Sequence, residues 1–440
     1  MKLLFKPLTL LFATSLFFAC SSDTATIAGD NETPTPTPST KPNILLIIAD
    51  DMGLDATPGF NVGSVKPNTP NLQNMINTGV RFTNLWSYPT CTPTRSSILT
   101  GKYGFRTGVM KVDDVLPTTE TSLQQFLEDE NAGYSNAVIG KWHLSNNPSH
   151  PTQMGIDYYA GLLSGGVRSY WEWNITQNQS STSSNEYTTT KFTDLAIDWV
   201  EQQNQPWFLW LAFNAPHTPF HLPPADLHSQ GSLPTDEASI DANPLPYYLA
   251  MIEAMDAEIG RLLDSMSQEE KDNTIIIFIG DNGSPNQVVQ DYRSRRAKGT
   301  LYQGGVNVPM IVSGKNVERF NQEEDQLLNT VDLFATISDI AGTGTNEIND
   351  SKSFKELFSS TSNSQNRDFA YTEHGQPSGD DEYTIRNGNY KYIKFTDGSE
   401  AFYNLSNDFF EVTNLLDRTL TTAEQQQLDD LKETLNNLKQ

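Results

Sequence analysis

Continuous apolar runs, each followed directly by polar residues, are the most regular feature of the chain. Residues 44–49 (I-L-L-I-I-A), 207–213 (W-F-L-W-L-A-F) and 274–280 (T-I-I-I-F-I-G) are such runs, and residues 137–140 form a shorter one. Apolar runs without polar alternation are typical of strands that are buried on both faces of a parallel sheet. The pattern therefore predicts four buried strands.

Segments of helical periodicity separate these predicted strands. They cover residues 122–131, 192–202 and 249–265, whereas residues 176–190, rich in Ser, Thr and Asn, are expected to form an exposed loop. Alternating strands and helices predict an α/β fold with a large, mostly parallel, doubly wound sheet flanked by helices. Ligands bind such sheets beyond the carboxyl ends of the strands.

Polar residues with metal-binding or catalytic chemistry follow the four predicted strands. They are Asp50 and Asp51, Lys141 and His143, His217, and Asp281 and Asn282. Each group alone could belong to a turn. If they gather at one edge of the sheet, their carboxylate and amide oxygens predict a site for one hard divalent cation. Ca²⁺ is preferred over Mg²⁺ because it tolerates irregular geometry. Zn²⁺ is disfavoured because it prefers His and Cys ligands.

The N-terminal region differs from the rest of the chain. Residues 1–19 resemble a signal peptide, with Lys2 and Lys6 before an apolar stretch that is too short to span a bilayer. The ending L-F-F-A-C resembles a bacterial lipoprotein box, which implies lipidation of Cys20 and, with Ser21 next, an outer-membrane location on the cell surface or the periplasmic face. Residues 20–41 are rich in Pro, Thr and Ser and are predicted to be a disordered tether.

The pattern changes again near residue 342, so we divide the remainder into a catalytic α/β domain, residues 42–342, and a small C-terminal α+β subdomain, residues 343–440. Three short strands are expected in the subdomain, followed by a terminal helix. The ranges are 381–385, 390–395 and 401–404 for the strands and 421–438 for the helix. An antiparallel sheet is predicted because turn residues join the strands.

Composition excludes several classes of protein. The 440 residues include 54 acidic and 29 basic side chains, a formal charge of -25 that argues against a nucleic-acid partner. With 37% hydrophobic and 10% aromatic residues the chain can fill a core, and the absence of long apolar runs excludes a polytopic membrane protein. A lipid anchor is then the only expected contact with a membrane.

Cys91 is the one cysteine outside the export signal. It lies in P-T-C-T-P-T-R-S-S-I-L-T-G, where Pro93 and its Thr and Ser neighbours are helix-start signals. A helix N-terminus favours an anion, and Arg95 adds a positive charge one turn later. The cysteine could be a buried core thiol or a catalytic thiolate.

The segment C-T-P-T-R at 91–95 resembles the sulfatase signature C-x-P-x-R. Other segments resemble later motifs of the same family in the same order, and together they cover nearly all of residues 42–420. They are K-P-N-I-L-L-I-I-A-D-D at 41–51, G-K-W-H-L at 140–144, A-P-H at 215–217, G-D-N-G at 280–283 and K-G-T-L-Y-Q-G-G at 298–305. The chain thus resembles the formylglycine-dependent sulfatases of the alkaline-phosphatase-like superfamily.

This resemblance implies a modified nucleophile and a bound cation. A formylglycine-generating maturation enzyme would convert Cys91 to Cα-formylglycine (3-oxoalanine), whose hydrated aldehyde attacks the sulfate ester. The implied ligands of the cation are Asp50, Asp51, Asp281, Asn282 and the formylglycine at position 91.

The resemblance also implies roles for the basic residues of these motifs. Arg95 and Lys141 would orient the formylglycine, and Lys141 and Lys298 would bind sulfate oxygens. His217 and Lys298 would protonate the leaving alcohol. His143 would assist the loss of sulfate from the hemiacetal. Fixed cations suit a reaction in which negative charge develops on the leaving oxygen.

Features outside the motifs bear on the substrate. Arg293 and Arg296 belong to a basic cluster that is either a solvated face or a patch for further anionic groups of a polyanionic glycan. Trp171 and Trp173 could stack on sugar rings or pack in the core. Gln303 stands where the family usually has Glu, which affects fine tuning more than activity.

The resulting hypothesis is a sulfuric ester hydrolase that removes sulfate from a sulfated polysaccharide or oligosaccharide. A surface tether suits the breakdown of polymers outside the cell. Two alternatives stay open: a phosphomonoester or phosphonate monoester hydrolase with the same formylglycine, and a catalytically silent glycan-binding lipoprotein.

Overall fold

The structure, a computed structural model, describes residues 41–440 apart from 294, 362–365 and 377–380. The predicted signal peptide, the lipidation of Cys20 and all but the last residue of the tether lie outside the described residues. Within the described part of the chain, no helix has both the length and the apolar character needed to cross a bilayer.

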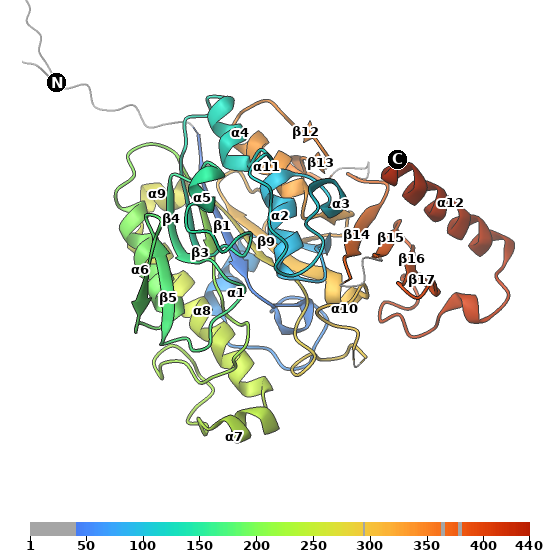
Figure 1. The fold of residues 1–440 in the computed structure, drawn as a ribbon, viewed down its shortest axis with the longest axis horizontal. Coiled ribbons are helices and arrows are strands. Elements are labelled where there is room, and N and C mark those ends of the chain that lie inside the picture. The colour runs from blue at the N-terminus through green and yellow to red at the C-terminus, as the bar shows by residue number, and fades with distance from the viewer. Residues whose placement is uncertain (1–40, 294, 362–365, 377–380) are drawn as a thin grey trace, which may run out of the picture. The chain divides into compact units, whose positions relative to one another are not determined.

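A large mixed sheet forms the centre of the described chain (Figure 1). Its strands are β1 (Asn43–Ala49), β2 (Gly79–Trp86), β3 (Ser135–Lys141), β4 (Tyr158–Leu162), β5 (Trp173–Gln177), β6 (Ser180–Ser184), β7 (Trp207–Ala212), β8 (Thr274–Gly280), β9 (Asn307–Gly314), β10 (Gln322–Glu324) and β11 (Leu328–Asn329). The order is β10-β2-β9-β8-β1-β7-β3-β4-β5-β6, and β11 pairs with β2. The neighbours β8, β1, β7, β3 and β4 are parallel, which confirms the predicted mostly parallel sheet built on the four apolar runs.

Helices cover both faces of this sheet (Figure 1). One face is covered by α1 (Pro70–Asn77), α6 (Thr188–Val200) and α8 (Leu245–Ser265), the other by α2 (Cys91–Thr100), α4 (Leu123–Asp129) and α11 (Asp332–Ile340). Successive side chains of a strand point to opposite faces, so Leu45 and Ile47 pack in the first core and Ile44 and Leu46 in the second. Burial of each such side chain stabilises the fold by about 1.5–3 kcal/mol.

Shorter elements connect this framework. They are α3 (Gly104–Thr107), α5 (His150–Gln153), α7 (Glu237–Ala242), α9 (Gln268–Asp272), α10 (Gln303–Val306), the 3-10 helices Leu54–Ala56, Lys355–Phe358 and Leu415–Asp417, and the strand pair β12 (Glu347–Ile348) and β13 (Ser351–Lys352).

The C-terminal region forms a second, antiparallel sheet with a terminal helix. Its strands are β14 (Ala370–His374), β15 (Glu382–Arg386), β16 (Tyr390–Lys394) and β17 (Glu400–Asn404), and the helix is α12 (Thr422–Lys439). Leucines of α12 at positions 428, 431 and 435 pack on the sheet. The antiparallel sheet and the helix were both predicted, whereas β14 was not.

A buried ion pair within the C-terminal region anchors Glu411, which contacts the main domain. The ammonium group of Lys391 lies 2.6 Å from Glu411 Oε1, and both side chains are buried. Glu411 also accepts a hydrogen bond from the backbone N–H of Gln303, and Gln303 Oε1 accepts one from the indole of Trp86. The C-terminal sheet is thereby tied to the strand that leads into Cys91, and Gln303 serves this connection.

One loop prediction is wrong. Residues 176–190 contain the end of β5 and all of β6, which form a hairpin, and α6 begins at Thr188. The side chains of β6 are exposed Ser and Thr residues. Pairing with the backbone of β5 holds this strand in place. Because its side chains do not pack into a core, the strand lacks the alternation of apolar and polar residues that marks a half-buried strand.

Candidate active site

The carboxyl ends of β1 and β8 bring acidic residues from distant parts of the sequence together. Ala49 pairs with Gly280 at the ends of these parallel strands, so Asp50 and Asp281 emerge side by side. The backbone N–H of Asp51 donates to Asp281 Oδ1 at 3.0 Å. Asp51 has a φ of 72°, a left-handed turn that few residues other than glycine adopt. The sheet register therefore fixes the acidic cluster.

Two oxygen atoms of this cluster have no hydrogen-bond donor among the described residues. Among the described residues, Asp50 Oδ1 and Asn282 Oδ1 are buried and have no hydrogen-bond partner. An unsatisfied buried acceptor costs about 1–3 kcal/mol. The ligand atoms of Asp50, Cys91 and Asp281 lie within 4.8 Å of one another. A bound cation would satisfy these oxygens, so the residues present fit the expected metal site.

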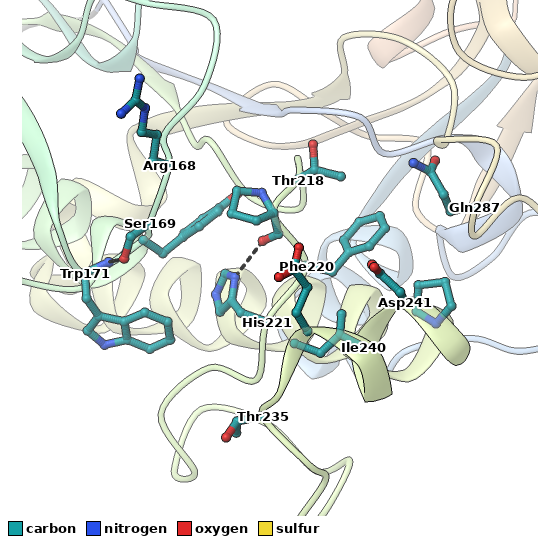
Figure 2. A pocket seen from close by; sticks show the side chains of 14 residues that line it. Arg168, Ser169, Trp171, Thr218, Phe220, His221, Thr235, Ile240, Asp241 and Gln287 are labelled. Atoms are coloured by element: carbon teal, nitrogen blue, oxygen red, sulfur yellow. Dashed lines mark hydrogen bonds between the residues drawn. The ribbon is translucent and has the colours of Figure 1, made fainter.

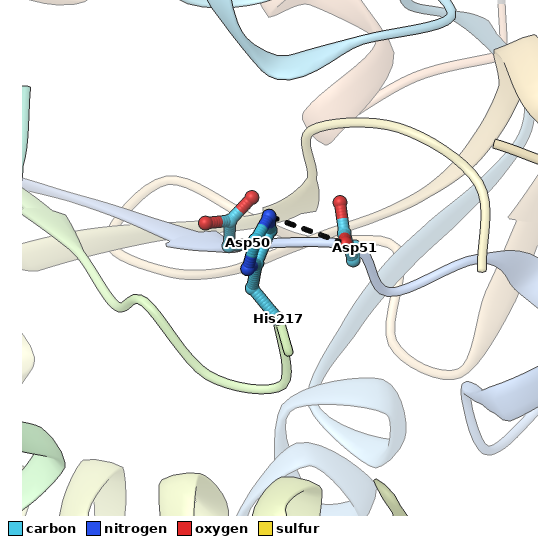
Figure 3. Close-up of side chains that lie close together, drawn as sticks. All are labelled: Asp50, Asp51 and His217. Atoms are coloured by element: carbon cyan, nitrogen blue, oxygen red, sulfur yellow. Dashed lines mark ion pairs between the residues drawn. The ribbon is translucent and has the colours of Figure 1, made fainter. Parts of the chain in front are cut away.

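A second grouping adds a histidine. Ligand atoms of Asp50, Asp51 and His217 also lie within 4.8 Å of one another. Figure 3 shows Asp50 and Asp51 on the segment that ends β1, with His217 reaching them from a loop. His217 Nε2 lies 3.8 Å from Asp51 Oδ2. Its Nδ1 lies 2.7 Å from the Thr218 carbonyl. A carbonyl only accepts, so Nδ1 carries the hydrogen and Nε2 faces the site.

Each buried carboxylate has its own cationic partner. Lys141 Nζ lies 2.5 Å from Asp50 and Lys298 Nζ lies 2.6 Å from Asp51. The Arg95 guanidinium lies 2.8 Å from Asp281. These three pairs leave the protein groups close to neutral, so a bound divalent cation would make the site positive and attract an anionic substrate.

The two inner carboxylates respond differently to burial. Burial favours the neutral acid at Asp50, but Lys141 and other nearby cations outweigh it and lower the pKa of Asp50. Burial and the charge of Asp50 raise the pKa of Asp281. Two carboxylates so close together resist simultaneous ionisation without further positive charge. This electrostatic conflict is a second indication of a cation site.

Cys91 lies at the first turn of α2, against the ends of β1 and β3. Its side chain is buried, with Sγ 3.2 Å from His143 Nδ1 and 3.5 Å from Lys141 Nζ. Burial raises the pKa of the Cys91 thiol to about 11, and the nearby Lys141 charge does not offset this effect. The protein groups alone thus disfavour the thiolate, which is the nucleophilic form of cysteine.

His143 is held with one ring nitrogen toward residue 91. Burial and nearby cations such as Lys141 lower the pKa of His143 to about 2, so its imidazole is neutral. Nε2 lies 2.8 Å from Asp113 Oδ1 and 3.3 Å from Thr92 Oγ1. An ionised carboxylate only accepts hydrogen bonds, so Nε2 carries the hydrogen. The lone pair of Nδ1 then points at the side chain of Cys91.

Gly165 and Gly166 allow a loop to pass close to the two histidines of the site, His143 and His217. A Cβ atom at Gly165 would lie 2.4 Å from His143 Nε2, and one at Gly166 would lie 3.2 Å from His217 Cε1. The connection between β4 and β5 can therefore pass over the site only with very small residues. Sequence reasoning missed Asp113 and both glycines. The Gly-Gly pair after an apolar strand was the available signal.

The predicted substrate residues fall into two groups. Lys141, His217 and Lys298 lie in the site. Arg293 donates instead to the carbonyl of Val412 at 3.3 Å, and Arg296 donates to the carbonyl of Glu411 and packs over the ring of Tyr302 at 4.2 Å. The structure gives both arginines partners in other segments and does not place them among the clustered carboxylates.

Family models match most of the chain. A model described as Sulfatase matches residues 42–343, and one described as N-sulphoglucosamine sulphohydrolase, C-terminal, matches residues 296–440. The chain is 29% identical to "Uncharacterized sulfatase YdeN" of Escherichia coli over 68% of its own length and 62% of that protein. It is 30% identical to "Arylsulfatase G" of Homo sapiens over 68% of its length and 65% of that protein. The chain thus spans less than two thirds of either relative.

Solved structures share the fold. The protein BT4656, in complex with its substrate D-glucosamine-2-N,6-O-disulfate, superposes with a TM-score of 0.76 at 22% identity, covering 91% of this chain and 98% of that one. Ps i-CgsB, in complex with k-i-k-neocarrahexaose, gives a TM-score of 0.75 at 22% identity, covering 90% and 92%. These similarities establish the architecture of the two sheets.

Asp113 fixes the tautomer of His143 through its hydrogen bond to Nε2, so we expect Asp113→Ala to shift His143 toward a mixture of tautomers. Side-chain ¹⁵N chemical shifts of histidine-labelled protein measure the change. His150 is an internal control, because the Leu116 carbonyl at 2.8 Å holds its Nε2 hydrogen independently of Asp113. Unchanged ¹⁵N shifts of His143 in the variant would contradict the assignment.

Proposed function

We propose, from the premise that this chain belongs to the sulfatase family, that it is a sulfuric ester hydrolase that removes sulfate from a sulfated carbohydrate. Cys91 in its setting carries the proposal: a buried residue at a helix N-terminus, between a neutral histidine and an ammonium group, beside the carboxylates of Asp50 and Asp281. We infer that residue 91 acts as formylglycine and that the cofactor is Ca²⁺.

Conversion of Cys91 resolves a chemical difficulty. A buried thiol with a pKa raised to about 11 is a poor nucleophile at neutral pH. A hydrated formylglycine supplies an oxygen nucleophile, together with a second hydroxyl that allows the sulfate to leave without attack of water on sulfur. The motif C-T-P-T-R at 91–95, shared with the family signature, supports recognition by a maturation enzyme.

The donor set supports a hard cation. Asp50, Asp51, Asp281 and Asn282 would hold it, together with the side chain of residue 91. Oxygen donors of this kind suit Ca²⁺, and Mg²⁺ is the second choice because it demands more regular geometry. The cation would polarise the nucleophile and neutralise negative charge on the ester.

The basic side chains divide the remaining tasks. Lys141 and Lys298 would bind the sulfate oxygens, and Arg95 holds Asp281 and the carbonyl of Lys141 in place. His217 presents Nε2 to the site, and its imidazolium form, with hydrogens on both ring nitrogens, would deliver the Nε2 proton to the leaving oxygen. His143 presents Nδ1 to residue 91 and would accept a hydroxyl proton there as sulfate departs.

The carbohydrate substrate is inferred from relatives and from the expected location. BT4656 and Ps i-CgsB bind sugars in their solved complexes, and an exported, outer-membrane lipoprotein would meet polymers outside the cell. We propose the lipid anchor on Cys20 and this location as part of the same function.

Catalysis requires the nucleophile, so Cys91→Ala is expected to lower kcat/KM for 4-nitrophenyl sulfate by roughly 10⁴-fold or more. Parent protein and variant, both from a maturation-competent host, are assayed on 4-nitrophenyl sulfate and on 4-nitrophenyl phosphate. For the parent we expect kcat/KM to be at least about tenfold higher for the sulfate than for the phosphate. A preference for the phosphate would favour a phosphomonoesterase. Equal rates with and without Cys91 would contradict the proposed chemistry.

Calcium should stabilise the protein because it satisfies oxygens that otherwise lack a partner. At a concentration of ~100 times Kd we expect Tm to rise by about 3 °C, and Asp50→Asn to abolish the shift. Differential scanning calorimetry of chelator-treated protein measures it. Asp264→Asn, a change at an exposed carboxylate, controls for nonspecific binding to an acidic chain. Equal shifts in the two variants would refute the site.

Lipidation of Cys20 predicts a change of cellular fraction. In a bacterial host that processes lipoproteins, Cys20→Ala should move the protein from the membrane pellet to the soluble or secreted fraction, as judged by immunoblot. Cys91→Ala is the matched control and should stay in the pellet. Retention of the Cys20 variant in the membrane would contradict a lipid anchor.

A further inference from the structure

A cavity of about 550 Å³ opens beside His217. Its lining includes Thr218, the next residue in the chain, and Tyr170, whose hydroxyl donates to the backbone carbonyl of His217 at 2.6 Å. Cavities of this size hold small ligands. The proposed function makes His217 the proton donor to the leaving oxygen, so the alcohol lies near His217, and this cavity begins at the next residue, Thr218.

Aromatic rings form one wall of the cavity (Figure 2). Trp171 is 37% exposed, and its ring centroid lies 5.0 Å from those of both Tyr187 and His221. Burial lowers the pKa of His221 to about 4, so this ring is neutral at physiological pH. Its two nitrogens lie 3.0 Å from the Tyr187 hydroxyl and the Pro219 carbonyl. The wall is therefore rigid, uncharged and suited to the apolar face of a sugar ring.

Charged side chains stand on opposite sides of the same cavity. Arg168 lies on one side and Asp241 on the other in Figure 2, and Glu237, one helical turn before Asp241 on α7, also lines the cavity. None of the hydrogen bonds or ion pairs among the described residues involves the side chains of these three residues. Charged groups that line a cavity without partners in the protein are available to a ligand.

We propose that this cavity binds the sugar of the sulfate ester, with one further anionic group of the substrate at Arg168 and unsulfated hydroxyls at Glu237 and Asp241. The guanidinium group binds a sulfate or carboxylate through paired hydrogen bonds. The two carboxylates accept hydrogen bonds from hydroxyls and repel sulfates. The substrate is accordingly a sparsely sulfated carbohydrate. This inference rests on the proposed function and specifies its substrate class.

Charge-removing variants test the two sides of the cavity separately. The probes are heparin- and carrageenan-derived disaccharides with one, two or three sulfates, and 4-nitrophenyl sulfate, which is too small to reach Arg168 and α7 together. We expect Arg168→Gln to lower kcat/KM for the disulfated sugars by roughly tenfold. This is the lower end of the range for a hydrogen bond to a charged group, because the Arg168 side chain is exposed. We expect Glu237→Gln/Asp241→Asn to raise kcat/KM for the trisulfated sugars several-fold. Both effects should shrink at high salt.

Hydrolysis of 4-nitrophenyl sulfate should stay within about twofold in these variants, since its ring does not span the charged walls. Lys315→Gln, a charge change away from this cavity, is the matched control and should not alter the preference among sugars. Variants that hydrolyse every sugar as the parent does, while the parent is active on 4-nitrophenyl sulfate, would overturn the inference and leave the proposed function standing.

If the parent protein hydrolyses no sulfate ester, the proposed sulfatase function fails, but the proposed binding of sugar in the cavity can still be tested. A binding measurement does this. Disulfated disaccharides are then titrated calorimetrically into Cys91→Ala protein with and without Arg168→Gln. Weaker binding to the double variant, by roughly tenfold, supports the cavity assignment. Equal binding, or none to either protein, contradicts it.

Discussion

The mutual repulsion of three buried carboxylates governs the site. Asp50, Asp51 and Asp281 meet at the ends of two adjacent parallel strands, where all three side chains are buried. Such a cluster is stable only if positive charge accompanies it, and Lys141, Lys298 and Arg95 supply one partner each. Two buried oxygens, at Asp50 and Asn282, have no donor within the described part of the chain. These oxygens are of the kind that a hard divalent cation would bind.

The register of the parallel strands produces this arrangement. Parallel pairing sets β1, β8, β7 and β3 side by side, so residues that follow each strand reach one edge. Helix α2 then delivers residue 91 with its N-terminus toward the carboxylates, and the C-terminal sheet braces the preceding strand through the buried pair of Lys391 and Glu411. The clustered side chains are thus positioned by the buried sheet, while the cavity beside His217 is lined by connecting segments and by α7.

Sequence reasoning could predict the parts of the site that follow strong local patterns. Asp50 and Asp281 were placed together because apolar runs mark buried strands and parallel strands end at one edge. Asp113 and Gly165 reach the site through loops, whose course depends on packing and leaves no periodic signal. The β5–β6 hairpin was missed because its exposed Ser and Thr strand lacks apolar alternation. Arg296 belonged to a visible basic cluster, but its partner, the carbonyl of Glu411, comes from more than a hundred residues away.

The account depends most on the chemical identity of residue 91, because Lys141, Asp50 and Asp281 lie around that side chain. Mass spectrometry of the tryptic peptide that spans residues 82–95, from protein made in its native or a maturation-competent host, measures it directly. The account predicts a loss of about 18 Da relative to the cysteine peptide, the difference between a thiol and an aldehyde side chain. An unmodified thiol on correctly exported protein would contradict it.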